Sequence, residues 1–324
     1  MRLEISGIAA PPEEGEGGLR DRIAMVLDVA AERIGKVTVI RRSLDARRRR
    51  PPRFVYVVEA SLPDDVSWTA NPAAGVTVRP APEREMPSFP PVRAGSGRRP
   101  VVIGCGPAGL FAALALASRG MPPLLLERGK AVAERVADVD RFWCDGLLNP
   151  ESHVHFGEGG AGTFSDGKLT SRSGNPRTVW VKRVLVEMGA PSSILTDSRP
   201  HIGTDRLREV VVRLRERLRE LGCEVRFGAR VTDLLTSRGR IAGVAVNSAE
   251  EIRTDCLILA IGQSADDTYG LLQARGVRLD AKPFAVGLRV EHPQALIDGI
   301  QYGRWRGNPA LPPADYFLTA RAVA

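Results

Sequence analysis

The chain has 324 residues, of which 43% are hydrophobic and 26% charged, and its formal net charge is +8. Because one hydrophobic core stops growing at about 250 to 300 residues, this length predicts two domains of the ordinary globular class rather than a disordered or fibrous chain. The first residues lack a positively charged stretch followed by an apolar one, so neither a secretory signal nor a transit peptide is predicted. The cytoplasm is therefore the expected location.

Membrane insertion and cysteine chemistry are not expected. The one long uncharged run, residues 100–118, has Gly104, Gly106 and Pro107 near its start, which favours a buried strand followed by a buried helix over a membrane span. The four cysteines lie far apart and form no C-x-x-C pair, which leaves a disulfide framework, a metal site and a dithiol redox centre without support. They are Cys105, Cys144, Cys223 and Cys256.

Residues 1–78 are expected to form a small α+β domain of the ferredoxin-like kind. Apolar alternation predicts short strands, and a period near 3.6 predicts one helix that places Ile23, Val26, Leu27 and Ala30 on one face. The expected strands are residues 2–8, 37–43 and 54–62, and the expected helix is residues 19–34. The second and third strands bracket a basic connection and resemble a hairpin arm.

That connection, residues 41–53 (RRSLDARRRRPPR), is the densest basic segment of the chain. Such a segment is typical of a nucleic-acid footprint, of a patch for an acidic partner, or of a solvated loop. No aromatic residues are interleaved to stack on bases, so the solvated loop is favoured and a nucleic-acid partner is not. Residues 79–99, rich in proline and glycine, are expected to form a linker to the next domain.

The second domain, residues 100–275, opens on a dinucleotide-binding pattern. Gly104, Gly106 and Gly109 form G-x-G-x-x-G directly after an apolar strand at residues 101–103. The first glycine permits a tight turn, the second lets the backbone approach a pyrophosphate, and the third lets helix and strand pack closely. Pro107 and Ala108 open the helix, whose N-terminal N–H groups and dipole favour the pyrophosphate.

An acidic residue stands where this pattern requires one. Glu127 ends the next apolar strand, residues 124–126, and its carboxylate is expected to accept hydrogen bonds from the adenosine ribose hydroxyls, with Arg128 beside it. A carboxylate at this place argues against a 2′-phosphate. The glycine pattern and the acid together do not show whether the bound dinucleotide is FAD or NAD.

The remainder of this domain is expected to be a helix and a strand meander. The helix, residues 205–221, is capped by Thr204 or Asp205 and ended by Gly222. The expected strands are residues 224–231, 241–246, 251–254 and 256–261, the last an apolar run typical of a strand buried on both faces. The inner face of the helix is expected to comprise Leu207, Val210, Val211, Leu214, Leu218 and Leu221.

This order of elements resembles the FAD domain of flavoproteins of the glutathione-reductase type. The resemblance implies that the backbone around Val231 meets adenine and that the turn from Ala260 to Gly262 approaches the cofactor phosphates. An NAD-only domain more usually continues through further β-α units, so FAD is the expected cofactor. A strand at residues 283–290 and a helix at 294–300 are expected to begin a further, incomplete domain, residues 276–324.

A second glycine-rich segment, NPESHVHFGEGGAGTFSDGKL at residues 149–169, offers backbone donors and short polar side chains. It suits contact with the ribityl chain, the pyrophosphate or the flavin ring, and the alternative is a flexible surface loop. The residues expected to touch cofactor are Gly159, Gly160, Thr163 and Lys168.

Catalytic candidates are few. His155, with His153, is placed to move protons near a flavin, although histidines also serve simply as hydrogen-bonding groups. Lys168 is a candidate to stabilise negative charge on a reduced flavin or to bind phosphate. Flavin redox chemistry needs little from the protein beyond orientation and electrostatics.

Together, NPES-x-V-x-FGEGGAGTFSDGKL, GCGPAGLFAALALASRG, LLLERGK and KPFAVGLRV resemble the bacterial and plastid proteins known only as uncharacterised NAD(P)/FAD-dependent dehydrogenases. The family implies an FAD-dependent oxidoreductase that passes hydride through a non-covalently bound flavin, with NAD(P)H a candidate electron donor and the small-molecule substrate unidentified. It also implies a C-terminal segment that completes the flavin site, so this chain is expected to be truncated. The alternatives are an FAD-containing protein that binds RNA or another partner, and an inactive flavoprotein.

Overall fold

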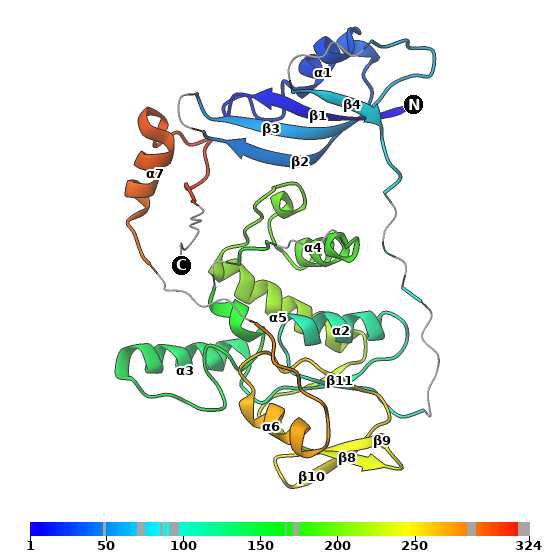
Figure 1. The fold of residues 1–324 in the computed structure, drawn as a ribbon, viewed down its shortest axis with the longest axis vertical. Helices are drawn as coiled ribbons and strands as arrows, with labels where there is room; N and C mark the ends of the chain where they lie inside the picture. Colours follow the sequence, from blue (N-terminus) through cyan, green and yellow to red (C-terminus); the bar gives the residue numbers. More distant parts are fainter. Residues whose placement is uncertain are drawn as a thin grey trace. The chain divides into compact units, whose positions relative to one another are not determined.

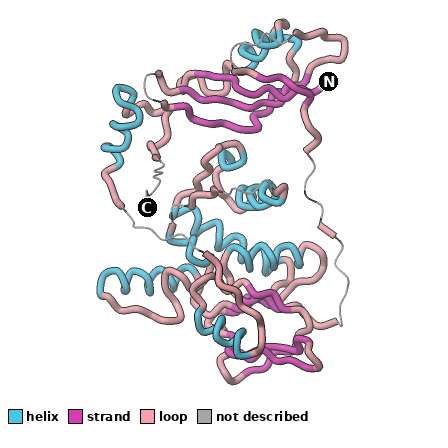
Figure 2. Tube along the Cα trace, in the orientation of Figure 1, coloured by secondary structure: helices cyan, strands magenta, loops and turns pink. Residues whose placement is uncertain are grey.

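The computed structural model describes residues 1–47, 50–69, 75–84, 87, 89–90, 97–165, 167–170, 175–283 and 290–316 (Figures 1 and 2). The chain divides into two units. One comprises Met1–Glu85, Leu195–Arg199 and Pro283–Ala324, and the other comprises Met86–Ile194 and Pro200–Lys282. The division differs from the expected one, because residues 283–324 group with the N-terminal unit, where Asn308 donates a hydrogen bond to Glu13.

The first unit is an antiparallel sheet with one helix packed on it. Its strands are β1 (Arg2–Ala10), β2 (Val37–Asp45), β3 (Arg53–Ser61) and β4 (Thr77–Pro80), in the order β2-β3-β1-β4. Alternate residues of β3 are buried because one face of the sheet packs on the helix. This strand order is the one expected of a ferredoxin-like unit, and β4 extends it beyond residue 78.

The expected helix at residues 19–34 is too long. Helix α1 spans Leu19–Leu27, because Asp28 adopts a left-handed conformation with φ of 54°. A short 3-10 turn, η1 (Ala31–Arg33), follows, so Ala30 is exposed instead of lying on the buried helix face. Ile23 and Leu27 are buried as predicted.

The basic segment is not a single solvated loop. Its first arginines lie in β2, and Arg53 begins β3. Asp45 accepts hydrogen bonds from Arg47 at 2.8 Å and from Arg53 at 3.4 Å, and chiefly the Arg47 bond holds the pKa of Asp45 well below its usual range. Arg42 pairs with Asp197 at 2.7 Å. Three arginines of the segment, Arg42, Arg47 and Arg53, are therefore paired with the carboxylates of Asp45 and Asp197.

The second unit is built around a parallel sheet. Its strands β5 (Val101–Ile103), β6 (Leu124–Leu126), β7 (Glu224–Arg226) and β11 (Leu257–Leu259) lie in the order β11-β5-β6-β7. This is the order of a Rossmann-type domain in which the first strand lies between the second and the fourth. The sheet thus confirms the predicted α/β dinucleotide-binding fold.

The two faces of this sheet are covered by different layers (Figure 1). Helices α2 (Pro107–Ala117) and α5 (Thr204–Glu220) share one apolar core with alternate strand residues such as Val102 and Leu125. The intervening strand residues face a meander and α6 (Asp266–Ala274). The meander strands are β8 (Val231–Ser237), β9 (Arg240–Val246) and β10 (Glu250–Arg253), in the order β10-β9-β8.

Several expected details of this unit are wrong. The strand expected at residues 224–231 is two strands, β7 and β8, separated by Gly228 at φ +62°. Strand β11 is not buried on both faces, because it lies at the sheet edge with Leu259 40% exposed. Gly203, rather than Thr204 or Asp205, caps α5, and the Thr204 hydroxyl instead donates to the Ser165 carbonyl at 2.9 Å.

Three of the described helices were not predicted: α3 (Val132–Asp145), α4 (Arg177–Glu187) and α6. Helix α7 (Gln294–Tyr302) confirms the one expected at residues 294–300, whereas most of the strand expected at residues 283–290 lies outside the described residues. Further 3-10 turns are η2 (Gly160–Phe164), η3 (Ser192–Leu195) and η4 (Gly303–Trp305). Within the described ranges, no helix has the length and apolar character that crossing a bilayer requires.

Candidate functional site

The three glycines of the first motif have different reasons to be glycine. Gly104 has φ of +100°, and a Cβ there would overlap the Ala260 carbonyl; at Gly109 a Cβ would overlap the Gly104 carbonyl oxygen. Gly106 has an ordinary φ of −75°, and the nearest atom to an added Cβ is the Gly160 Cα at 3.7 Å. Protein packing therefore requires Gly104 and Gly109 but does not require Gly106.

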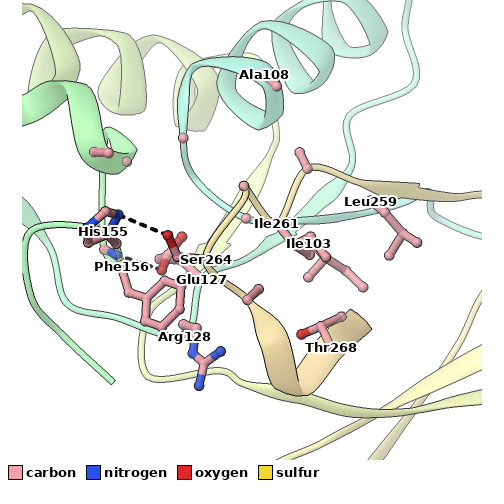
Figure 3. Close-up of a pocket in the computed structure, with 18 of the residues that line it drawn as sticks. Ile103, Ala108, Glu127, Arg128, His155, Phe156, Leu259, Ile261, Ser264 and Thr268 are labelled. Carbon is pink, nitrogen blue, oxygen red and sulfur yellow. Dashed lines mark hydrogen bonds between the residues drawn. The ribbon is translucent and has the colours of Figure 1, made fainter. Parts of the chain in front are cut away.

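The space beside Gly106 belongs to a cavity of about 470 Å³ (Figure 3). The volume is within the usual range of small-molecule sites, about 300 to 1,000 Å³. Its walls come from the glycine turn with the start of α2, the end of β6, the second glycine segment, the start of β8, and the loop between β11 and α6. The cavity thus lies at the carboxyl ends of the parallel strands, where ligands bind in open α/β sheets.

Glu127 is a buried carboxylate in the wall of this cavity. Its Oε1 accepts the N–H groups of Gly129 at 2.8 Å and Gly157 at 3.0 Å, and its Oε2 accepts the Cys105 N–H at 2.7 Å. A carboxylate oxygen has room for about two donors. Among the described residues Oε2 receives one backbone donor, so it retains capacity for a hydroxyl group of a ligand.

A buried arginine shapes the second glycine segment. Arg135 on α3 has no exposed surface, and its guanidinium donates to four main-chain carbonyls at 2.5 to 2.9 Å. These carbonyls belong to His153, Val154, Glu158 and Gly160. Burial lowers the pKa of Arg135 to about 10, which leaves it protonated at neutral pH. The segment that forms one wall of the cavity therefore wraps around a cation.

A second buried charge, the carboxylate of Glu158, anchors the same segment to two helices. Glu158 is fully buried, and its Oε2 accepts the Val132 N–H at the start of α3 and an N–H of Arg215 on α5, both at 2.8 Å. Burial raises the pKa of Glu158. Its carboxylate ties the glycine segment to two helices without lining the cavity.

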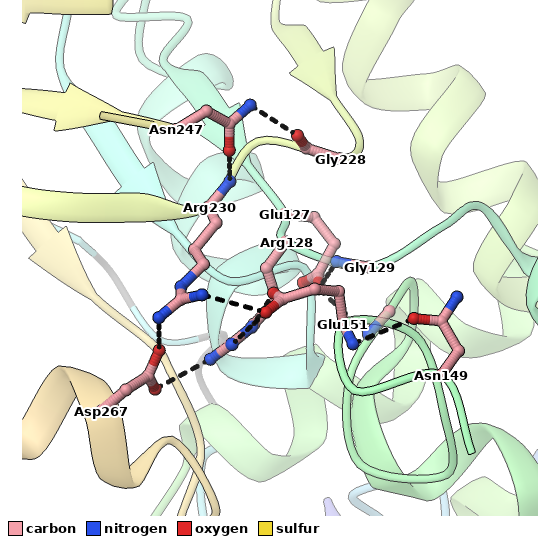
Figure 4. Close-up of polar contacts among 10 residues, drawn as sticks. Glu127, Arg128, Gly129, Asn149, Glu151, Gly228, Arg230, Asn247 and Asp267 are labelled. Atoms are coloured by element: carbon pink, nitrogen blue, oxygen red, sulfur yellow. Dashed lines mark hydrogen bonds and ion pairs between the residues drawn. The ribbon is translucent and has the colours of Figure 1, made fainter. Parts of the chain in front are cut away.

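Four charged side chains close into a ring at the Glu127 end of the cavity (Figure 4). Arg128 makes a bidentate pair with Glu151 at 2.9 and 3.0 Å and a 2.9 Å pair with Asp267. Arg230 pairs with the same carboxylates at 3.1 and 2.8 Å. The two positive and two negative charges give the ring no net charge. The ring links the end of β6, the second glycine segment, the start of β8 and α6.

The two histidines of the glycine segment differ in surroundings. His155 lines the cavity, and its Nδ1 lies 3.0 Å from the Ser264 hydroxyl on the opposite wall (Figure 3). His153 contacts the Phe156 ring, and burial together with nearby cationic groups lowers its pKa. Of the two, only His155 is placed to contact a ligand in the cavity.

Most residues expected to bind cofactor do line the cavity. These are Gly104, Gly106, Pro107, Ala108, Glu127, Arg128, Gly160, Val231, Ala260 and Gly262. Gly109, Gly159, Thr163 and Lys168 are not among the lining residues. The buried Thr163 hydroxyl donates to the Glu158 carbonyl at 3.0 Å, the Gly159 N–H donates to the Cys105 carbonyl at 2.8 Å, and Lys168 forms a β-bridge with His201. Asp166 lies outside the described residues.

Sequence reasoning missed the side chains that organise the site, namely Arg135, Glu151, Phe156, Arg230, Ser264 and Asp267. Glu151 and Phe156 stand in the second glycine-rich segment, which the sequence analysis did single out. The other four carry no local signal, because their partners are distant in sequence.

Comparisons with known proteins add the following. Residues 2–61 match a domain of unknown function (DUF8436), and residues 283–324 match a family model described as FAD-dependent protein, C-terminal domain-like. An uncharacterized protein of Clostridium beijerinckii is 38% identical over 322 residues. That alignment covers 98% of this chain and 60% of the relative, so the chain spans about three fifths of the relative's length.

Solved structures similar to this chain include THI4 of Thermovibrio ammonificans, at 16% identity and a TM-score of 0.38, covering 56% of this chain and 64% of that one. A 3-ketosteroid-delta4-(5alpha)-dehydrogenase of Rhodococcus jostii is 17% identical with a TM-score of 0.34, covering 54% and 47%.

Proposed function

We propose that this chain binds FAD non-covalently in the cavity beside Gly106 and acts as part of an FAD-dependent oxidoreductase. The observation that carries the proposal is the empty space where a Gly106 Cβ would stand. No neighbouring atom of the described residues requires a glycine there, whereas a pyrophosphate approaching the helix N-terminus does. The FAD-dependent family model that matches residues 283–324 supports the same cofactor.

The residues present fit the ribose and the pyrophosphate of such a dinucleotide. The remaining capacity of Glu127 Oε2 suits a ribose hydroxyl, and its buried negative charge disfavours a 2′-phosphate. The N-terminal turn of α2 supplies N–H groups to the pyrophosphate, and His155 faces it from the other wall. Bound FAD would supply the two-electron redox chemistry, and the chain would supply orientation and shielding from water.

Alanine substitutions in the glycine motif test this assignment. Gly106→Ala is expected to leave the free energy of unfolding within about 0.5 kcal/mol of the parent value while weakening FAD binding at least about tenfold, because the methyl group occupies ligand space. Gly109→Ala is expected to destabilise the fold itself, since its methyl overlaps a backbone carbonyl. Urea denaturation and quenching of flavin fluorescence measure the two effects.

Gly270→Ala is the matched control, because Gly270 lies on α6 with no atom within 4 Å of an added Cβ. It is expected to fold at least as stably as the parent chain. Unchanged FAD affinity in Gly106→Ala would refute the cavity assignment.

Oxidoreductase activity has its own test. The FAD-loaded protein is mixed anaerobically with NADH or with NADPH, and the visible absorbance of the flavin is followed. Bleaching by either nucleotide, with colour restored by an added electron acceptor, is the expected outcome. Flavin that stays oxidised with both nucleotides would exclude NAD(P)H as the donor.

A further inference from the structure

The first unit has a cavity of its own, which shares no lining residue with the cavity beside Gly106. Its volume is about 560 Å³, within the usual range of small-molecule sites. Its walls come from β1, α1, the end of β2, the start of β3 and the loop before β4, all within Met1–Glu85. The charged residues that line this arginine cavity are Arg22, Arg47, Arg53 and Asp45.

Carboxylates hold the three guanidinium groups of the arginine cavity in the same way. Asp45 accepts the Nε and Nη2 groups of Arg47, both at 2.8 Å, and those of Arg53, both at 3.4 Å. Glu14 accepts the same two groups of Arg22, at 2.7 and 2.5 Å. Among the described residues, no acceptor is hydrogen-bonded to Nη1 of any of the three. Each arginine is therefore oriented by a carboxylate and keeps the Nη1 side of its fork for a ligand.

The charge and the number of donors favour a phosphate ligand. The three arginines leave the cluster with a net positive charge even when Glu14 is counted with Asp45. Each guanidinium has five N–H donors, so the two held by a carboxylate leave about nine for a ligand, more than the roughly four acceptor sites of a single carboxylate. A phosphate has three strong acceptor oxygens and a diphosphate has more, which matches this donor set better.

The other walls of the arginine cavity are mostly aliphatic. No aromatic ring is among its lining residues, so a nucleobase would have nothing to stack on. Met25 lines the cavity and is nevertheless 65% exposed, so an aliphatic chain bound there would remove apolar surface from water. The apolar lining residues are Ile8, Ala9, Met25, Val26, Val55 and Val76.

We propose that the arginine cavity binds an aliphatic phosphate ester, with its phosphate or diphosphate group on Arg22, Arg47 and Arg53 and its chain against Met25 and the valines. This gives the basic segment, which has no part in the proposed flavin site, a ligand of its own. A free ester and the headgroup of an acidic lipid present the same chemistry, and the test separates these two sources.

The test is calorimetric titration of the whole chain with geranyl diphosphate, inorganic pyrophosphate and UDP. Geranyl diphosphate is expected to bind at least about tenfold more tightly than pyrophosphate, because its chain buries apolar surface. It is also expected to bind more tightly than UDP, whose base finds no ring to stack on. Sedimentation with phosphatidylcholine vesicles that contain phosphatidic acid would identify a lipid as the source, and absence of sedimentation would identify a free ester.

Substitutions test the head group and the chain separately. Arg47→Leu and Arg53→Leu are each expected to weaken geranyl diphosphate and pyrophosphate by about tenfold or more, the usual effect of losing a charged donor. The Arg47 side chain is 77% exposed, so its replacement is expected to leave the fold intact. Met25→Ser is expected to weaken geranyl diphosphate and to leave pyrophosphate unchanged.

Arg33→Leu is the matched control. Arg33 is an arginine of the same unit that pairs with Asp65 at 2.6 Å, but it does not line the cavity. It is expected to bind geranyl diphosphate as the parent chain does. FAD affinity is expected to be the same in all four variants, because none of the substituted residues lines the cavity beside Gly106.

The outcomes decide this proposal separately from the flavin site. Equal geranyl diphosphate affinity in the parent chain, Arg47→Leu and Arg53→Leu overturns it, as does a parent chain that binds neither geranyl diphosphate nor pyrophosphate. A preference for UDP or for a short single-stranded RNA also overturns it, since that would indicate a nucleic-acid site. Geranyl diphosphate binding without FAD binding would refute the flavin site and leave the arginine cavity standing.

Discussion

Arg135→Leu is expected to lower the free energy of unfolding by at least about 3 kcal/mol and to abolish FAD binding. Four carbonyls of the second glycine segment lose a charged donor at once, and leaving a buried acceptor unpaired costs about 1 to 3 kcal/mol. Arg135→Lys is expected to lose most of the same energy, because one ammonium cannot reproduce the guanidinium fork.

Urea denaturation followed by circular dichroism measures this loss. Arg141→Leu, on the exposed part of the same helix, is the control and is expected to change stability by less than about 0.5 kcal/mol. If Arg135→Leu matched Arg141→Leu in both stability and FAD affinity, the glycine segment would not depend on the buried cation.

Glu127→Gln is expected to cost about 2 to 4 kcal/mol of stability, which is the second large effect. The carboxylate accepts three backbone N–H groups, whereas a carboxamide presents an NH₂ group toward at least one of them and leaves that donor unpaired. FAD affinity is expected to fall as well, because both the ribose contact and the glycine turn depend on this side chain.

The stability loss is measured by thermal and urea unfolding of the ligand-free chain. Glu134→Gln is a suitable control, because Glu134 is an exposed residue in the first turn of α3. Its loss is expected to be no more than the modest helix-dipole contribution of a surface carboxylate, about 0.3 to 1 kcal/mol. Equal stability of the two variants would mean that the buried carboxylate network contributes little.

Much of the fold could be predicted from patterns among residues that are close in sequence. The strand, glycine turn and helix from Val101 onward, and the acid at Glu127, depend on residues close in sequence, and the structure has them where they were predicted. The apolar stripe of α5 is equally local, and Val210, Leu214 and Leu218 are buried as expected.

What could not be predicted depends on distant partners. An apolar run does not reveal whether a strand is central or at an edge, and β11 proved to be an edge strand. The Arg128 to Asp267 pair joins residues 139 apart in sequence, and no periodicity indicates such a pairing. Arg135 resembled an ordinary helix arginine, because only the fold wraps the glycine segment around it.

The most direct test of the central claim is a crystal structure of the chain grown with FAD. We expect a ribose hydroxyl hydrogen-bonded to Glu127 and the pyrophosphate against Gly106 and Ala108. FAD bound elsewhere, or no FAD in the cavity at saturating concentration, would contradict it.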